Sequence, residues 1–410
     1  MDLNFTFHIS TFKLNMVMKR ELLNKIYYVG VNDRQKTLFE NMLPLPYGVS
    51  YNAYFIDDEK TVLVDTVEQP FAEQLLAQVQ ELLAGRQLDY LIVNHMEPDH
   101  SSGIKTLQAI YPNMQIIANA KTIDMLGGYY GIKDGFHVVK DGDSLNIGSR
   151  TLQFYFAPMV HWPEVMVTYS VEDKLLFSAD AFGCFGTLDG AVLDTELNLE
   201  KYYTEMVRYY ACIVGKYGAP VQTALKKLGG LDIKMVCSTH GPVWTEHIGE
   251  VIGIYNRLSK YETEPGVVIA YGSMYGHTEE MAEMVARGAA SVTKNVVLHD
   301  VSRSDHSYIL ADIFRYKGFI CGAPTYCGEL YPNAATLLAK IKTRGVKNHE
   351  FGCFGSFTWA NATAKPFEAF AEAMKWEITG YVEVKQAMTA EQAEALYELG
   401  RAVALKTINN

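Results

Sequence analysis

Four side chains that can bind a metal ion occur within six positions of the sequence. They follow residues 88–93, a short apolar run that we interpret as a buried strand. Charged groups at such a strand end need partners, because burial without them is costly. Because side chains alternate along a strand, the first three lie on one side of it, and a turn at Pro98 can bring the fourth side chain to the same side. The cluster consists of His95, Glu97, Asp99 and His100. Nitrogen and oxygen donors without a thiolate suit iron, manganese or zinc, so we predict a metal site in preference to a capped loop before a helix.

Three further strand ends each supply one more ligand. In αβ folds, functional groups gather at such positions. The runs and their ligands are 154–160 with His161, 174–179 with Asp180, and 233–239 with His240. A lone histidine at a strand end is usually structural. Three such ends after one His-x-Glu-x-Asp-His cluster instead predict a site for two metals.

The order of these ligands resembles the metallo-β-lactamase-like fold, an αββα sandwich with a two-metal site at one sheet edge. The resemblance covers roughly residues 25–258. Zinc hydrolases of that superfamily have a histidine where this chain has Glu97. A carboxylate is a harder donor that adds negative charge and favours higher-valent iron, whereas hydrolytic zinc sites need only an activated water. Glu97 therefore favours redox chemistry over hydrolysis.

A second motif lies in the C-terminal part of the chain. Residues 266–271 form a predicted buried strand, and residues 272–278 follow it before a predicted helix. Small and hydroxyl residues at such a junction let backbone amides and hydroxyls surround a phosphate. The spacing S-x-x-G-x-T is that of the flavodoxin phosphate loop and not of a Walker A loop, since no Gly-Lys-Ser/Thr follows.

Two more strand ends, after residues 316–321 and 350–355, carry aromatic loops of the kind that hold an isoalloxazine ring at a topological switch point. We therefore predict FMN. The predicted FMN-binding residues are Ser273, Met274, Tyr275, Gly276, His277, Thr278, Ala323, Pro324, Thr325, Tyr326, Gly328, Ser356, Phe357, Thr358, Trp359, Ala360 and Asn361. The third loop has Thr358, Ala360 and Asn361 where glycines are commoner in flavodoxin-like sequences.

The two modules together resemble the flavodiiron proteins, also called A-type flavoproteins. The resemblance implies an N-terminal extension (1–24), a metallo-β-lactamase-like diiron domain (25–260) and a flavodoxin-like domain with a doubly wound parallel sheet (261–410), an α/β and α+β architecture. It implies that His95, Glu97 and His161 hold one iron, that Asp99, His100 and His240 hold the other, and that Asp180 bridges them. In some members of the family, water replaces the counterpart of His100 as a ligand. A tyrosine often lies beside the diiron pocket, and we match it to Tyr210, with Tyr209 as the alternative.

The resemblance also implies an activity. It predicts reduction of dioxygen to water, or of nitric oxide to nitrous oxide, at a non-haem diiron centre that receives electrons through FMN. The external donor would be rubredoxin, a rubredoxin reductase or a reduced deazaflavin. The protein would form a head-to-tail homodimer or a dimer of dimers. Two alternatives stay open: a zinc hydrolase with an appended flavodoxin domain, and a non-catalytic flavin electron carrier.

Composition agrees with these predictions. The formal net charge of −11 argues against nucleic acid or an anionic membrane as a partner. The six cysteines contain no C-x-x-C pair, so we expect neither a fused rubredoxin domain nor a disulfide framework. The expected lack of disulfides is consistent with the reducing cytoplasm. Apolar segments are too short to span a bilayer. Residues 1–20 are interpreted as a tag-like extension in preference to a targeting presequence.

Overall fold

The first domain begins with a seven-stranded sheet. The computed structural model describes residues 19–408. The spatial order of strands is β1 (Arg20–Leu23), β2 (Ile26–Tyr28), β7 (Tyr54–Ile56), β8 (Val62–Val64), β9 (Tyr90–Ile92), β10 (Gln115–Ala118) and β11 (Phe136–Val138). The first four pair antiparallel and β8 to β11 pair parallel. Residues 20–23 thus form the edge strand of this sheet instead of belonging to the predicted extension, because they pair with β2. The prediction for residues 1–18 lies outside the described residues.

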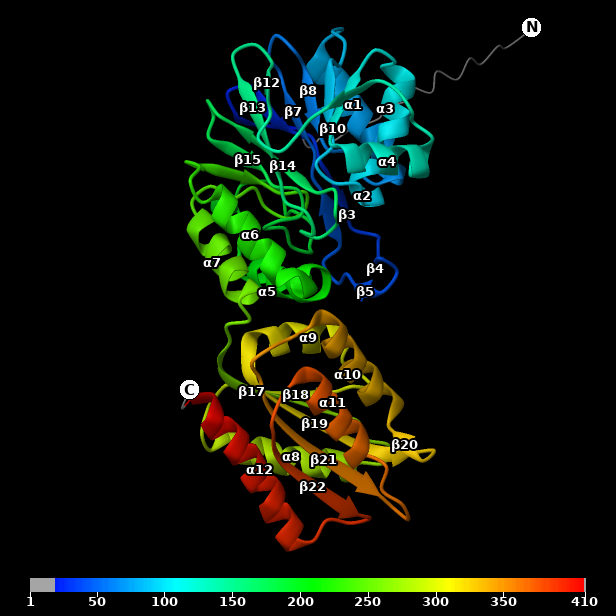
Figure 1. The fold of residues 1–410 in the computed structure, drawn as a ribbon, viewed down its shortest axis with the longest axis vertical. Helices are drawn as coiled ribbons and strands as arrows, with labels where there is room; N and C mark the ends of the chain where they lie inside the picture. The colour runs from blue at the N-terminus through cyan, green and yellow to red at the C-terminus, as the bar shows by residue number, and fades with distance from the viewer. Residues whose placement is uncertain (1–18, 409–410) are drawn as a thin grey trace, which may run out of the picture.

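A second, five-stranded sheet faces the first (Figure 1). Its strands, in spatial order, are β12 (Ser144–Asn146), β13 (Thr151–Phe156), β14 (Met166–Ser170), β15 (Leu175–Phe177) and β16 (Met235–Cys237). The last pair is parallel and the others are antiparallel. Two short ladders lie at the open end of the sandwich: β3 (Val31–Asp33) with β6 (Val49–Tyr51), and β4 (Leu38–Phe39) with β5 (Leu43–Pro44).

Helices cover the outer faces of both sheets. On the first sheet lie α1 (Ala72–Leu83), α3 (Ile104–Ile110) and α4 (Ala120–Tyr130), and α2 (Pro98–Ser101) is a single turn beside them (Figure 1). The second sheet is covered by α6 (Gly218–Leu228) and α7 (Ile248–Ser259), while α5 (Glu200–Tyr209) lies at its lower end. Short 3-10 turns η1 (Gln69–Phe71), η2 (Asp194–Glu196) and η4 (Gly215–Tyr217), and a π-helix η3 (Tyr210–Val214), complete the domain. The predicted αββα sandwich is confirmed.

Strand register explains why ligands from distant segments meet. Phe177 at the end of β15 pairs with Cys237 at the end of β16 in a parallel ladder. Asp180 and His240 each lie three residues beyond these ends (180 − 177 and 240 − 237), so both leave the sheet at the same edge. Strands β15 and β16 are buried throughout and entirely apolar, which fixes their register against the core.

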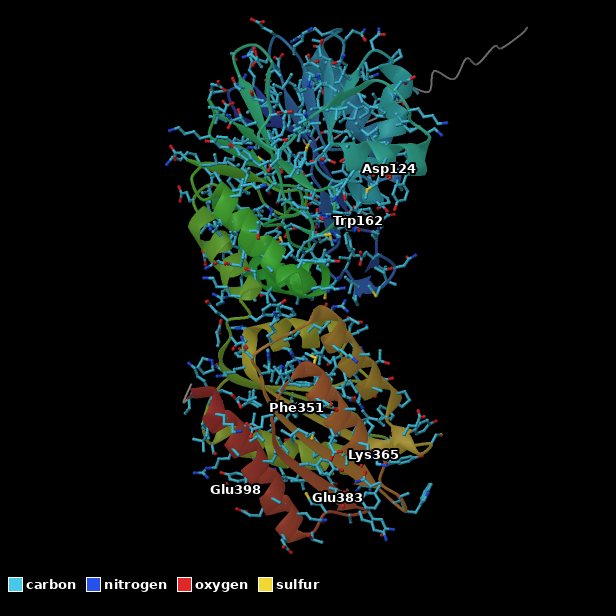
Figure 2. All side chains as sticks on the ribbon, viewed as in Figure 1. Asp124, Trp162, Phe351, Lys365, Glu383 and Glu398 are labelled. Carbon is cyan, nitrogen blue, oxygen red and sulfur yellow. The ribbon has the colours of Figure 1, made fainter. Side chains whose placement is uncertain are left out.

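The second domain is a parallel sheet covered by helices on both faces. Its order is β18 (Val296–Asp300), β17 (Glu264–Tyr271), β19 (Tyr316–Tyr326), β21 (Glu350–Phe357) and β22 (Ile378–Lys385), with the short β20 (Glu329–Leu330) on β19. The helices are α8 (His277–Ala290), α9 (His306–Arg315), α10 (Pro332–Arg344), α11 (Ala364–Met374) and α12 (Ala390–Ile408). Phe351 on β21, labelled in Figure 2, is fully buried in the core of the second domain. The strand order 2-1-3-4-5 is the doubly wound flavodoxin arrangement that was predicted.

The two domains meet across α5 and α9, which pack against each other. Helix α7 ends at Ser259 and β17 begins at Glu264, so we propose that the domain boundary lies in the four intervening residues, near the predicted position 260. Across residues 19–408, no helix is both long enough and apolar enough to cross a membrane.

Candidate metal centre and flavin cavity

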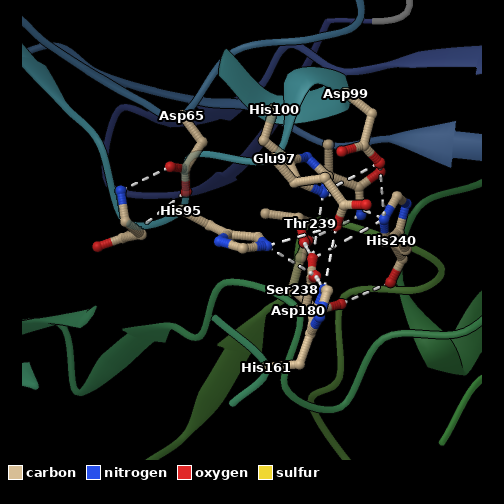
Figure 3. Close-up of polar contacts among 12 residues, drawn as sticks. Asp65, His95, Glu97, Asp99, His100, His161, Asp180, Ser238, Thr239 and His240 are labelled. Carbon is tan, nitrogen blue, oxygen red and sulfur yellow. Dashed lines mark hydrogen bonds and ion pairs between the residues drawn. The ribbon is translucent and has the colours of Figure 1, made fainter. Parts of the chain in front are cut away.

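The fold brings all seven predicted metal ligands into two adjoining groups (Figure 3). The first group is His95, Glu97, His161 and Asp180, and the second is Asp99, His100 and His240. Within each group, one ligand atom from every residue lies within 4.8 Å of the others. All seven residues are buried. Residues from four separate chain segments therefore form two adjacent sites with the chemistry of metal ligands.

The predicted strand alternation in the first cluster is wrong at one point. It placed Glu97 and Asp99 on the same side, but Pro98 occupies the first turn of helix α2, where its fixed φ is favourable. Helical rotation then turns Asp99 and His100 away from Glu97. Glu97 joins His161, with 3.0 Å between Oε2 and Nε2, and Asp99 joins His240, with 3.3 Å between Oδ2 and Nε2.

Asp180 lies between the two groups with one carboxylate oxygen toward each. Its Oδ2 is 3.2 Å from Nε2 of His161 and 3.4 Å from Nε2 of His95. Its Oδ1 is 3.1 Å from Nε2 of His100 and 3.8 Å from Nε2 of His240. This is the geometry of a carboxylate that bridges two cations.

Several buried ligand atoms lack a hydrogen-bond partner among the described residues. They are Nε2 of His95, both carboxylate oxygens of Asp99 and Oδ2 of Asp180. Buried polar atoms nearly always have a hydrogen-bond partner, so a cluster of metal-binding atoms without such partners requires an explanation. Metal ions at the two groups would satisfy these atoms. The residues present therefore fit a two-metal centre.

The carboxylates make the pocket strongly favourable for positive charge. Burial alone lowers the pKa of a histidine, yet here the neighbouring carboxylates outweigh it. Asp180 and Glu97 raise the pKa of His161 to about 9. Asp99 and Asp180 raise the pKa of His100 to about 9. The same field would attract metal cations.

Three orienting contacts were not predicted from the sequence. Nδ1 of His95 donates to Oε1 of Glu164 over 2.8 Å, and Nδ1 of His240 donates to the backbone carbonyl of Ser50 over 2.7 Å. The Thr239 hydroxyl donates to Oδ1 of Asp180. Such contacts fix the tautomer of a metal-binding histidine and leave Nε2 free for the ion. The one available signal was the acidic residue three positions after His161.

Tyr209, and not Tyr210, faces the metal ligands. The Tyr209 ring lies 5.6 Å from the ring of His240, and its buried hydroxyl has no hydrogen-bond partner. Burial raises the pKa of Tyr209, and the negative charge of Asp180 raises it further. Tyr210 instead packs its ring against Tyr255 at 5.1 Å. The sequence-based match to Tyr210 is corrected accordingly, because consecutive helical residues point about 100° apart.

Aromatic rings and one more carboxylate lie close to the metal ligands. Trp162 lies 5.4 Å from His95, and Phe39 lies 5.6 Å from His240, measured between ring centroids. Glu40 occupies the turn between β4 and β5, at a left-handed φ of 49°. Partial burial and the charge of Glu97 raise the pKa of Glu40 to about 7. The centre is thus shielded by rings, and the acidic side chain of Glu40 approaches it.

The second domain contains a cavity of about 450 Å³ at the carboxyl ends of its strands. This volume lies within the usual range for small-molecule sites. Oγ of Ser273 accepts hydrogen bonds from the backbone N–H groups of Gly276 (3.1 Å) and Glu279 (3.3 Å), which shapes the loop before α8. The Thr278 hydroxyl lies 2.8 Å from Oγ of Ser356. Hydroxyls and a helix N-terminus thus meet at one end of the cavity, as a phosphate requires.

Most predicted flavin residues line this cavity. Those that do are Ser273, Met274, Tyr275, His277, Thr278, Pro324, Thr325, Tyr326, Gly328, Ser356, Phe357, Thr358, Trp359 and Ala360. The predicted Gly276, Ala323 and Asn361 do not; Asn361 instead donates to the hydroxyl of Tyr381 over 2.8 Å. Cys327 and Gln386 line the cavity and were not predicted. Tyr275 and Trp359 are each 89% exposed, so their ring faces are free to stack on a planar ligand.

Comparisons with known proteins identify the family. Residues 49–241 match the ODP family beta lactamase and residues 269–400 match the flavodoxin family. A nitric oxide reductase of Moorella thermoacetica is 31% identical over 387 residues, covering 93% of this chain and 97% of that protein. The chain belongs to the flavodiiron protein family. The resemblance inferred from the sequence is therefore confirmed, and the cofactors of the family are a diiron centre and FMN.

Solved structures agree with this assignment. The flavodiiron protein of Giardia intestinalis superposes with a TM-score of 0.92 at 30% identity, covering 96% of this chain and 97% of that one. Rubredoxin oxygen:oxidoreductase of Desulfovibrio gigas superposes with a TM-score of 0.91 at 28% identity, covering 95% of this chain and 98% of that one. The similarity extends over both domains of this flavodiiron protein.

Proposed function

We propose that this flavodiiron protein reduces dioxygen to water, nitric oxide to nitrous oxide, or both, with electrons delivered through FMN from an external donor. The observation that carries the proposal is the position of Asp180, with one oxygen toward each ligand group. A two-metal site of this kind, on the same chain as a flavin cavity, supports a reductase over a zinc hydrolase or a simple electron carrier. The names of the relatives support both gases.

The geometry supports the following ligand assignment. One iron would be held by His95, Glu97 and His161, the other by Asp99, His100 and His240, with Asp180 bridging. Oxygen-rich coordination with histidines stabilises iron through changes of valence. His100 lies 3.1 Å from Asp180 and faces the centre, which supports its inclusion as a ligand. Two ferrous ions and a two-electron flavin supply four electrons, as many as dioxygen needs to become two waters.

The residues around the centre have three tasks in this proposal. Glu164 holds His95 with Nε2 toward the metal position. Phe39 and Trp162 pack against His240 and His95 and would help to exclude bulk water from the centre, which limits the release of partly reduced products. The Tyr209 hydroxyl is an unpaired donor that would hold a proton for the developing oxygen charge. Dioxygen needs four protons and four electrons; two nitric oxides need two of each.

Electron delivery supports an intermolecular arrangement. Figure 1 shows the carboxyl ends of β21 and β22, where the flavin cavity lies, at the end of the second domain far from the first. Exposed apolar side chains occur near both sites: Met274, Tyr275, Tyr326 and Trp359 at the cavity, and Leu38 and Met42 in the β4–β5 hairpin, whose Phe39 packs against His240. A head-to-tail dimer would cover both patches and bring one flavin to the partner's irons. We propose this dimer, alone or as a dimer of dimers.

The electron donor and the location are proposals of the same kind. The printed name of the Desulfovibrio gigas protein includes rubredoxin, which supports rubredoxin as a donor. A rubredoxin reductase or a reduced deazaflavin are the alternatives. All six cysteines are free, in agreement with a reducing compartment such as the cytoplasm.

An anaerobic gas-electrode experiment tests the function. The purified, iron-loaded and FMN-loaded protein is reduced chemically, and consumption of dioxygen and of nitric oxide is measured in parallel. Consumption of either gas, with kcat/KM values that rank the two, is the expected result. The absence of consumption of both gases by fully loaded protein would contradict the proposal.

A further inference from the structure

Three consecutive side chains at the junction of α5 and η3 face three different surroundings. Arg208 points to the junction with the second domain, Tyr209 to the metal ligands, and Tyr210 to Tyr255. The chain then continues as the π-helix η3. Single turns of π-helix occur often at functional sites, where the extra residue redirects side chains. The end of α5 therefore joins the domain junction to the metal centre.

Arg208 is a buried cation held by both domains. Its side chain is 1% exposed and forms an ion pair with Glu205, with 2.9 Å between Nε and Oε2. Nη1 donates to the hydroxyl of Ser307 on α9 over 3.1 Å. The guanidinium lies 4.6 Å from the ring of Phe185 and 4.7 Å from the ring of Tyr308. It thus lies against one ring of the first domain and one ring of the second.

Ring contacts continue from Phe185 to a metal ligand. The Phe185 ring lies 5.0 Å from Tyr209 and 5.3 Å from Phe39. Tyr209 and Phe39 each lie 5.6 Å from the ring of His240. All four of these residues are buried. Packed interiors have few voids, so a shift of Phe185 must displace its neighbours.

We propose that Arg208 is a positioning residue for the metal centre, and that docking of α9 on α5 sets the positions of Tyr209 and His240 through it. The inference rests on the proposed roles of Tyr209 and His240. It makes the flavodoxin domain a structural support of the metal site in the same chain. Arg208 cannot swing away without leaving the buried Glu205 carboxylate unpaired, so its position is fixed as long as Ser307 and Tyr308 hold it. The flavodoxin domain would then deliver electrons to the metal centre of the partner chain and hold the metal ligands of its own chain in position.

The test changes the second domain and leaves Arg208 in place, because Arg208→Ala would strand a buried carboxylate and endanger folding. Tyr308 also lines an open cleft between the domains, of about 830 Å³, so that truncating it does not empty a closed core. The variants are Tyr308→Ala and Ser307→Ala in the full-length protein loaded with iron and FMN. Tyr308→Phe keeps the ring over the guanidinium. Tyr261→Phe is the matched control, since it removes one hydrogen bond near the same junction, to the carbonyl of Gly215, without touching Arg208.

Small displacements of a reacting geometry cost large factors in rate, so Tyr308→Ala should lower kcat between about ten- and a hundred-fold. The KM for the gas, the iron content and the FMN content should change little. The Mössbauer spectrum should shift for one of the two irons, and Tyr308→Phe should restore both the rate and the spectrum. Ser307→Ala should give a smaller change in the same direction.

Two results separate this inference from the proposed function. If Tyr308→Ala and Ser307→Ala match Tyr261→Phe in kcat and in the iron spectrum, Arg208 does not position the centre and the inference is overturned. If the wild-type protein consumes neither gas, the proposed function fails. The comparison of iron spectra then still decides whether the domain contact reaches the metal centre.

Discussion

Oε1 of Glu164 lies 2.8 Å from Nδ1 of His95, and neither side chain is exposed to solvent. The same oxygen accepts the backbone N–H of Met96 over 2.9 Å. The carboxylate therefore holds the imidazole in the tautomer that leaves Nε2 toward the metal position, and its charge increases the basicity of that nitrogen. Binding of His95 to iron thus depends on a residue that is not itself a ligand.

Replacing Glu164 with Gln should weaken iron binding. The change keeps the size of the side chain and removes its charge, so His95 becomes a poorer ligand. The expected loss is about 10- to 100-fold in metal affinity, the usual effect of removing such a partner. Iron content after dialysis against a graded chelator measures it. Glu73→Gln, on the exposed side of α1, is the control, and equal iron retention in both variants would contradict the proposed role.

Removing a ligand should have a more severe effect. Glu97→Ala or Asp180→Ala deletes a carboxylate of the proposed ligand set, so most bound iron and all turnover should be lost while FMN stays bound. Metal analysis, flavin absorbance and gas consumption provide the three measurements. Wild-type protein loaded with zinc alone should be inactive with both gases. Full gas-reducing activity with zinc would contradict the redox assignment.

The two adjacent tyrosines should respond differently to the loss of their hydroxyls. Tyr209→Phe removes the hydroxyl proposed to donate to the oxygen charge that develops during reduction, and a hydrogen bond to a charged group is worth about 1.5–3 kcal/mol, so kcat should fall roughly ten-fold or more. Tyr210→Phe should leave kcat unchanged, because its ring packs against Tyr255 away from the ligands. Steady-state gas consumption at equal iron content compares them. The reverse order of effects would restore the assignment to Tyr210.

The sequence predicted the features that depend on neighbouring residues. Short apolar runs followed by His161, Asp180 and His240 are local patterns, and the strands that end in Phe177 and Cys237 lie within the predicted runs. The strand before His161 ends earlier than predicted, at Phe156, and a turn covers the rest of that run. The flavin loops were equally local, because each follows a buried strand of the parallel sheet in the second domain. Domain order and fold class then followed from the combination of motifs.

Contacts between distant segments could not be predicted in the same way. Glu164 and His95 are 69 positions apart, and only the packing of the second sheet on the first brings them together. Tyr209 and Tyr210 have the same side chain at adjacent positions, so the choice between them depends on how α5 is rotated against the core. Asn361 lies in a predicted loop, but a hydrogen bond to Tyr381 on β22 turns it from the cavity.

Flavin affinity should depend on Thr278. Thr278→Val removes a buried hydroxyl at the phosphate end of the cavity, where a charge-assisted hydrogen bond is worth about 1.5–3 kcal/mol. FMN affinity should fall roughly ten-fold or more, at about 1.4 kcal/mol per decade, with iron content unchanged. Fluorescence titration of the apoprotein measures it, with Thr336→Val on the exposed face of α10 as the control. Wild-type affinity, or FAD bound in place of FMN, would show that the phosphate site lies elsewhere.

Mixed dimers should show which chain's irons receive the electrons. One chain carries Glu97→Ala, and the other carries Ser273→Ala with Thr278→Val, so that one lacks iron and the other binds FMN poorly. In a head-to-tail dimer of the two, the flavin of the first chain faces the intact irons of the second, and partial activity should return. Native mass spectrometry establishes that mixed dimers form. If they form and stay as inactive as their parents, electrons pass within a chain, and the apolar patches around the two sites do not meet across the dimer.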